Sequence, residues 1–179
     1  MKIVSSIPQL EDLAAKSDFG TIYIDPPWTY RKKKKKGAAS NHYRTMKLEE
    51  IVRIPVYKLA NPRSHLHLWT TTTFLKQGLW LLDKWGFEYK GMFVWCKSSL
   101  GLGNYWRVSH EMLLLGVRGK MSFHHKGMKS WMCLTRGRHS EKPDVIREMI
   151  EKVSPPPRIE LFARKATEGW TVFGDEIDS

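Results

Sequence analysis

The sequence predicts an α/β fold, in which a mainly parallel sheet carries helices on both of its faces. Short apolar runs with strand character alternate along the chain with segments of helical spacing, which is the pattern of parallel sheets. The chain has 179 residues and is 41% hydrophobic, which suits one domain over residues 1–179 with a real core. In such sheets ligands bind beyond the carboxyl ends of the strands, so residues that directly follow strands are the candidates for function.

The expected elements follow from periodicity and from signals at their ends. Period-two alternation or β-branched content predicts strands at residues 21–24, 65–69, 87–95, 111–117, 158–163 and 171–174. Helical spacing predicts helical turns within residues 47–60, interrupted by Pro55, and helices at residues 74–85 and 143–153. Residues 29–46, 100–109 and 118–141 lack periodicity and predict loops, and long loops in compact domains are usually functional or disordered.

The charge of the chain indicates a polyanionic partner. Thirty Lys and Arg residues against eighteen Asp and Glu residues give a formal net charge of +12. A domain this basic usually has nucleic acid nearby, although a merely basic protein is the plainer alternative. Residues 31–36 are six consecutive cations, among which Lys33 and Lys34 are candidates for substrate phosphates; a solvated loop is the alternative.

Other composition features exclude further classes. Cys96 and Cys133 are the only cysteines and have no ligand spacing, so neither a metal site nor a disulfide framework is expected. No apolar run approaches the roughly 18 residues that span a membrane. The first eight residues lack the apolar region of a signal peptide, which favours an intracellular, cytoplasmic protein without a membrane partner.

The tetrapeptide Asp25-Pro26-Pro27-Trp28 is the candidate catalytic segment, because it follows an apolar strand directly. One reaction that such a segment could assist is methylation of the exocyclic amine of adenine. This amine is a poor nucleophile, since its lone pair is delocalised into the ring. Hydrogen bonds from both amino hydrogens to a carboxylate (Asp25) and a carbonyl (Pro26) would free that lone pair. The two prolines fix the backbone, and Trp28 offers a flat face on which a base can stack. An ordinary turn after a strand is the alternative.

The tetrapeptide is one of several short segments that occur in the same order in a known family. On these segments the sequence resembles the MT-A70 family of N6-adenine methyltransferases. The segments stand in order at residues 22–28, 42–46, 66–70, 85–89, 95–97, 110–116, 139–144 and 159–164. The resemblance implies a Rossmann-like fold that uses S-adenosylmethionine, with a permuted motif order in which the catalytic strand precedes the cofactor strand. It also implies transfer of a methyl group to the N6 amine of adenine in a nucleic acid, with Asp25 touching both the target base and the cofactor.

The resemblance assigns roles to residues beyond the tetrapeptide. It implies target or substrate contacts for Tyr43 and Glu111 and a cofactor or substrate contact for Lys142. It places Glu160 and Arg164 beside S-adenosylmethionine, together with the tail residues Asp175 and Glu176. Asp175 stands where the family has Asn, which replaces a two-way hydrogen-bonding amide by an acceptor.

Several alternatives remain open at this level. Glu111 could cap a strand and Glu160 could form a surface ion pair, while Trp69, Trp95 and Trp106 are expected in the core rather than as base platforms. DNA is the favoured substrate because the chain is compact and strongly basic, and RNA is the alternative. A non-catalytic nucleic-acid-binding subunit and a homodimer or heterodimer are further alternatives.

Overall fold

One sheet of eight strands organises the part of the chain that the computed structural model describes, which comprises residues 2–4, 6–16, 18–30, 45–99, 101, 105–135, 142–174 and 177. The strands are β1 (Lys2–Val4), β2 (Phe19–Ile24), β3 (Ala60–Thr70), β4 (Glu88–Cys96), β5 (His110–Arg118), β6 (Trp131–Cys133), β7 (Arg158–Leu161) and β8 (Trp170–Phe173). The helices are α1 (Ile7–Ala14), α2 (Leu48–Ile51), α3 (Val56–Leu59), α4 (Leu75–Lys84) and α5 (Asp144–Val153), and a 3-10 turn, η1 (Thr72–Phe74), precedes α4.

The sheet is mainly parallel, and its one reversed strand matters for the site. The strand order is β1-β8-β7-β2-β3-β5-β4-β6. Strand β5 is antiparallel to both of its neighbours, whereas every other pair is parallel. The start of β5 therefore lies at the same edge of the sheet as the ends of the other strands. We call this edge the catalytic edge.

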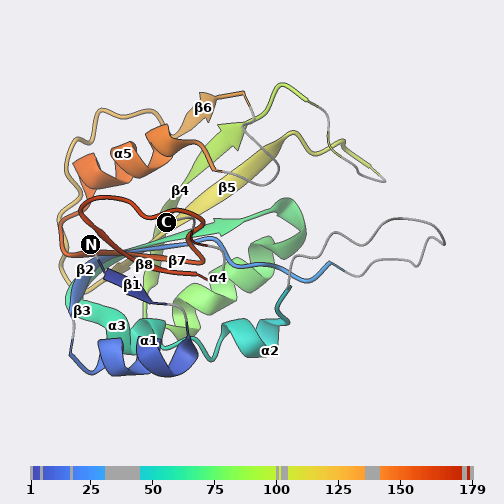
Figure 1. Cartoon of the computed structure of the whole chain (residues 1–179). Helices are drawn as coiled ribbons and strands as arrows, with labels where there is room; N and C mark the ends of the chain where they lie inside the picture. Colours follow the sequence, from blue (N-terminus) through green and yellow to red (C-terminus); the bar gives the residue numbers. More distant parts are fainter. Residues whose placement is uncertain are drawn as a thin grey trace.

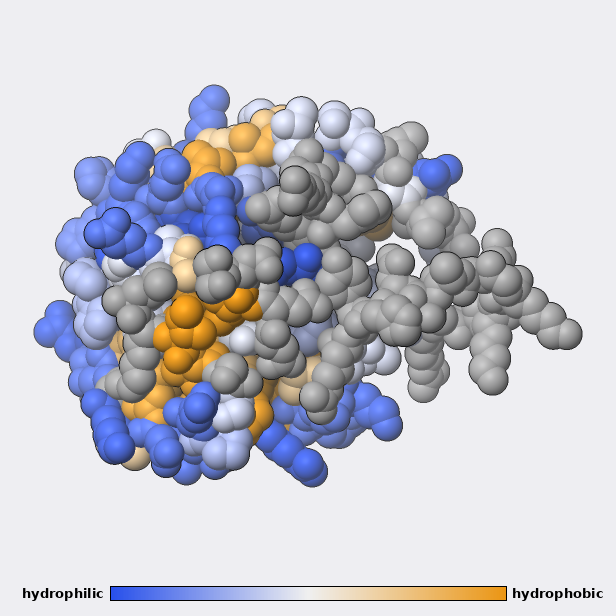
Figure 2. All heavy atoms as spheres, in the orientation of Figure 1, coloured by the Kyte–Doolittle hydropathy of each residue, from blue (hydrophilic) through white to orange (hydrophobic). Residues whose placement is uncertain are grey.

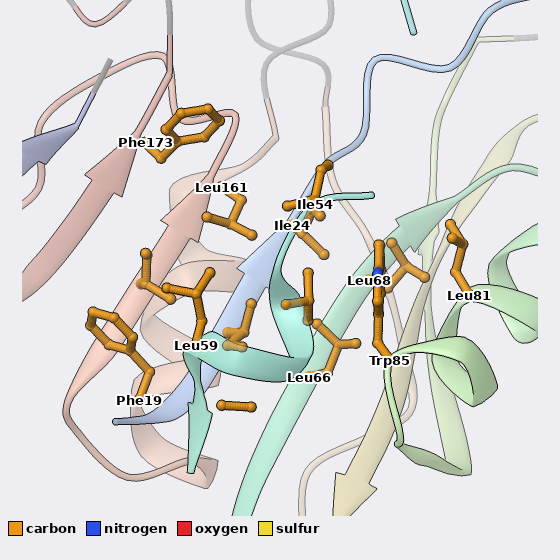
Figure 3. Close-up of a cluster of buried hydrophobic side chains, with 14 of the residues drawn as sticks. Phe19, Ile24, Ile54, Leu59, Leu66, Leu68, Leu81, Trp85, Leu161 and Phe173 are labelled. Carbon is orange, nitrogen blue, oxygen red and sulfur yellow. The ribbon is translucent and has the colours of Figure 1, made fainter. Parts of the chain in front are cut away.

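Helices cover both faces of the sheet, as the sequence predicted (Figure 1). Figure 1 shows α5 on one face and α1, α3 and α4 on the other. Below the sheet, apolar side chains from β2, β3, β7 and β8 pack with α3 and α4, as Figure 3 shows for Leu68, Leu81 and Trp85. A second buried cluster under α5 includes Trp69 and Ile146.

Most elements that periodicity predicts are present, with boundaries that shift by a few residues. Helix α4 ends at Lys84, and Gly86 follows with a φ of 76°, a left-handed conformation that favours glycine at a helix end. The expectation of an uninterrupted loop at residues 118–141 is wrong, because β6 lies within it as a three-residue edge strand. The elements β1 and α1 were not predicted.

The surface is mostly hydrophilic on the face that Figure 2 shows, with an apolar area near the start of the chain. Near the start of the chain, the apolar residues Ile3 and Ile7 are exposed, and Ile7 opens α1. Among the described residues, no helix has both the length and the apolarity to cross a membrane.

Candidate active site

A pocket of about 660 Å³ opens at the catalytic edge. Its walls come from the residues after β2, β3, β7 and β8, from the start of β5, from the start of α1 and from the residue before the N-cap of α5. The volume is within the range of pockets that hold small molecules the size of a nucleotide cofactor. The site thus lies where ligands bind in parallel sheets.

The Asp-Pro-Pro-Trp segment lines this pocket and is held by its own backbone. Asp25 follows β2, and its side chain is 30% exposed. The Pro26 carbonyl accepts a hydrogen bond from the Trp28 amide at 2.8 Å, and the Pro27 carbonyl accepts one from the Met46 amide at 2.7 Å. A carbonyl oxygen has two lone pairs, so the Pro26 oxygen retains one acceptor direction. The segment therefore offers a fixed carboxylate and a fixed carbonyl to a ligand.

Trp28 is less available for stacking than the sequence indicated. Its side chain is only 8% exposed, and its ring stacks on Phe74 with centroids 4.9 Å apart and planes 10° apart. Its indole N–H points to the Trp69 carbonyl at 3.4 Å. One ring face is thus occupied by Phe74, and a base can meet only the other face or the edge of Trp28.

Tyr30 extends this aromatic group toward solvent. Its ring meets Phe74 edge-on with centroids 4.8 Å apart, and its hydroxyl lies 3.3 Å from the Thr71 hydroxyl. Tyr30 is half-exposed, and both Tyr30 and Thr71 line the pocket. Sequence reasoning missed Tyr30. Its position two residues after the tetrapeptide was the available signal.

Four side chains of alternating charge are paired in a row at the pocket, and three of them line it. Lys142 Nζ contacts Asp25 Oδ2 at 2.5 Å and Glu111 Oε2 at 3.3 Å, and Lys97 Nζ bonds to Glu111 Oε1. Lys142 lies 5.3 Å from the Trp69 ring centre and Lys97 lies 4.5 Å from that of Trp95. We call Lys97, Glu111, Lys142 and Asp25 the charge chain. Glu111 is therefore aimed into the site rather than capping its strand.

The charge chain keeps its central members ionised despite their burial. Burial alone would lower the pKa of Lys142, but the carboxylates of Asp25 and Glu111 outweigh it and raise that pKa above its ordinary value. Burial alone would raise the pKa of Glu111, but the ammonium groups of Lys142 and Lys97 outweigh it and hold that pKa below its ordinary value. The pair thus remains charged over the whole neutral range. Lys97 directly follows β4, which was the sequence signal for it.

The opposite wall of the pocket is more apolar. Phe162, Phe173 and Arg164 line it, and so does Ile7 at the start of α1. Phe162 has a φ of 63°, which is rare for a side chain of this size and turns the backbone sharply after β7. At Gly174 an added Cβ would lie 2.1 Å from the Ala163 carbonyl oxygen, so only glycine fits between these strand ends. Aromatic side chains, a cation and a close backbone suit a cofactor with a flat ring and a carboxylate.

Glu160 occupies a different position from the other predicted cofactor residues. Both of its carboxylate oxygens bond to Arg147, at 2.9 Å to Nε and 3.1 Å to Nη2. Burial raises the pKa of Glu160, although the Arg147 guanidinium opposes the rise. Glu160 is absent from the described pocket lining, whereas Arg164 is part of it. The cofactor role of Glu160 stays a prediction.

The structure brings together Asp25, Glu111, Lys142 and Arg164 from four separate chain segments. Tyr43, Lys33, Lys34, Asp175 and Glu176 lie outside the described residues. Trp69 and Trp95 are buried, as expected. The expectation that Trp106 belongs to the core is wrong, because its side chain is 92% exposed.

The mainly parallel sheet with helices on both faces agrees with the Rossmann-like methyltransferase fold that the resemblance implies. The family model MT-A70 matches residues 19–176 of this chain. The chain therefore belongs to the MT-A70 family.

Individual relatives agree with this assignment. The chain is 33% identical to the Type II methyltransferase M.MunI of a Mycoplasma species, over 89% of this chain and 78% of that protein. It is 28% identical to the human N(6)-adenosine-methyltransferase catalytic subunit METTL3, over 93% of this chain. It is 29% identical to the human N(6)-adenine-specific methyltransferase METTL4, over 89% of this chain. The chain spans only 30% and 37% of the lengths of these two human proteins.

Proposed function

We propose that this chain transfers a methyl group from S-adenosylmethionine to the exocyclic N6 amine of adenine in DNA. The observation that carries the proposal is the partly exposed carboxylate of Asp25, which follows β2 directly and lies beside Pro26 in a pocket at the catalytic edge. Membership of the MT-A70 family and the names of its relatives support the reaction.

In the proposed reaction the protein works mainly by positioning. Lys142 holds Asp25 Oδ2, so we assign Oδ1 and the Pro26 oxygen as acceptors for the two amine hydrogens. These hydrogen bonds draw the amine nitrogen out of conjugation and direct its lone pair into the pocket. Because Asp25 already accepts a hydrogen bond from the amine, it is also placed to receive the proton that the nitrogen must lose.

The apolar wall is the proposed cofactor side. S-adenosylmethionine, when bound, supplies an electrophilic methyl group on a positively charged sulfur. Phe162 and Phe173 would contact its apolar parts, and Arg164 would hold its carboxylate. Asp25 and Lys142 line the same pocket as this wall, which supports contacts of both residues with cofactor and base.

DNA is the proposed polymer for two reasons. A relative that this chain matches over 89% of its own length and 78% of that protein is named a type II methyltransferase, which we take as support for DNA. The net charge of +12 supports binding to a phosphate backbone, which RNA shares. Adenosine in RNA is the second candidate, since the METTL3 match covers nearly all of this chain. The intact tetrapeptide supports activity rather than a binding-only role.

The test compares methyl transfer to duplex DNA, single-stranded DNA and RNA of one sequence, using labelled S-adenosylmethionine and identifying the methylated base. Asp25→Ala is expected to reduce transfer by about 10³-fold or more, because the amine loses its principal acceptor. Binding of S-adenosylmethionine should be largely retained in this variant.

Asp83→Ala is the matched control, since Asp83 is an exposed aspartate on α4 outside the pocket. N6-methyladenine in DNA alone supports the proposal as stated, and label in RNA alone assigns the second candidate. Full activity of Asp25→Ala would remove Asp25 from the mechanism.

A further inference from the structure

Two adjacent aromatic side chains stand almost fully in solvent. Tyr105 is 95% exposed and Trp106 is 92% exposed, whereas Trp69, Trp95 and Trp170 are each at most 2% exposed. Large apolar rings are seldom left this exposed without a binding role, because water contact with them is unfavourable. The exposure of Tyr105 and Trp106 therefore indicates that a binding partner covers them.

The pair projects from a loop that is closed at its base. This loop joins β4 to β5, and Lys97 N–H bonds to the Ser109 carbonyl at 2.7 Å across its two ends. Gly101 N–H bonds to the Val108 carbonyl at 2.8 Å, and Arg107 Nε donates to the Gly101 carbonyl at 2.7 Å. Among the described residues, these bonds tie Gly101 to Arg107 and Val108, which directly follow the pair.

The loop leaves the sheet beside the pocket. Both of its ends lie at the catalytic edge, where Lys97 and Glu111 of the charge chain flank it. At Gly101 an added Cβ would lie 2.3 Å from the Val108 carbonyl oxygen, so the close approach at the base of the loop requires glycine. The two rings thus stand on a loop that leaves the sheet at the catalytic edge, beside two members of the charge chain.

The chemistry of the surroundings favours a nucleic-acid base over a protein partner. Two copies of a chain with a formal charge of +12 repel each other, whereas a nucleic acid is attracted. Bases present flat, uncharged faces that stack on Trp and Tyr, and such stacking accepts any base sequence. A base next to the target also lies on the same strand and within a few ångströms of the pocket mouth.

We propose that Tyr105 and Trp106 form a stacking platform for the unpaired bases that border the target adenine. This inference rests on the proposed function and adds a substrate contact to it. In duplex DNA the target base must leave the stack, and the platform stabilises the opened strand by replacing lost stacking. The rings neutralise no phosphate, so they contribute affinity that does not depend on salt.

The test measures equilibrium binding of labelled duplex and single-stranded DNA to Trp106→Ala and Tyr105→Ala, with S-adenosylmethionine binding measured in parallel. Loss of one ring is expected to weaken DNA binding roughly tenfold, with an unchanged salt slope and unchanged cofactor affinity. Trp106→Phe should retain most of the affinity. The effect of Trp106→Ala should shrink on duplex DNA that carries a mismatch at the target adenine, because that strand is already partly open.

Trp80→Ala is the matched control, since Trp80 is 40% exposed on α4 and lies outside the pocket lining. Unchanged DNA affinity in folded Trp106→Ala would overturn the platform while leaving methyl transfer, and thus the proposed function, intact. A wild-type dimer that Trp106→Ala converts to monomer would overturn it in favour of an interface between copies of this chain.

Discussion

Two clusters of polar side chains lie along β3, on the face of the sheet that α5 covers. They differ in charge and in exposure to solvent. At the carboxyl end of β3 lies the charge chain, which consists of paired opposite charges and of which Asp25, Glu111 and Lys142 line the pocket. Further back, His65 Nδ1 and His67 Nε2 each lie 2.8 Å from Ser154 Oγ, and all three side chains are at most 4% exposed. We call these three residues the histidine–serine cluster.

Helix α5 accounts for the difference between the clusters. Lys142 stands directly before the N-cap of α5 and reaches the charge chain, whereas Ser154 is the C-cap of α5 and closes over the histidines. Where the helix covers the sheet, the histidines are neutral and both meet the Ser154 hydroxyl. Where the helix begins, charges of opposite sign are paired and still reach solvent. Buried polar groups are thus separated into a closed structural cluster and an open one that can bind a ligand.

The largest expected effect belongs to the histidine–serine cluster, which should make the folded protein less stable as the pH falls. Burial lowers the pKa of His65 from 6.5 to about 4 and that of His67 to about 3. Because the folded-state pKa lies below the unfolded-state value, the unfolded chain binds more protons as the pH falls from 6.5. Stability is therefore complete above pH 6.5 and declines toward pH 3–4, by roughly 3 kcal/mol at pH 4 for the fully buried His67 alone.

Chemical denaturation between pH 7.5 and 5 measures this loss before most carboxylates titrate. In His67→Asn the slope of unfolding free energy against pH should fall by up to about 1.4 kcal/mol per pH unit, since one buried titrating group is gone. An identical slope in the variant would mean that protonation of His67 in the histidine–serine cluster does not contribute to the pH dependence of stability.

The sequence could predict the open cluster better than the closed one. Asp25 stands in a motif directly after an apolar strand, and Lys142 and Arg164 lie in segments that the family resemblance covers. The alternation of residues 65–69 predicted a strand, but it could not show that Ser154, 87 residues after His67, would lie between two histidines. Such contacts depend on how α5 crosses the sheet, which local periodicity does not encode.

Other elements escaped prediction for identifiable reasons. Strands β1 and β6 have three residues each, which is too short for a period-two pattern to be recognised. The resemblance predicted Glu111 as a substrate contact, whereas the residues alone left a strand cap as the alternative. Glu111 lies in the pocket because β5 runs antiparallel to its neighbours, and strand direction follows from pairing rather than from composition. Trp106 was assigned to the core because tryptophan is apolar on average, although its loop places it in solvent.

Removing the central cation of the open cluster should give the next largest effect. Lys142→Met is expected to lower kcat/KM for methyl transfer about 100-fold, because Asp25 and Glu111 lose the ammonium group that holds them in place. The pKa of Glu111 should then rise toward its ordinary value, so the acid limb of the pH profile of kcat/KM moves to higher pH.

Lys142→Arg is the matched control for this change, since it keeps the positive charge. It should leave the acid limb where the wild-type protein has it, even if the longer side chain lowers the rate. A Lys142→Met profile that coincides with the wild-type profile would show that the charge chain does not govern ionisation in the pocket.

The smallest expected effect is the loss of one hydroxyl from the closed cluster. In Ser154→Ala both histidine nitrogens lose the partner that lies 2.8 Å away, and a buried group without a partner is costly. We expect the free energy of unfolding to fall by about 1–2 kcal/mol, with kcat and KM unchanged at a temperature where the variant is folded. Ser122→Ala, at an exposed serine, controls for the substitution itself. A lower kcat in folded Ser154→Ala, without a change in stability, would contradict the separation of the two clusters. It would show that the histidine–serine cluster affects methyl transfer through α5.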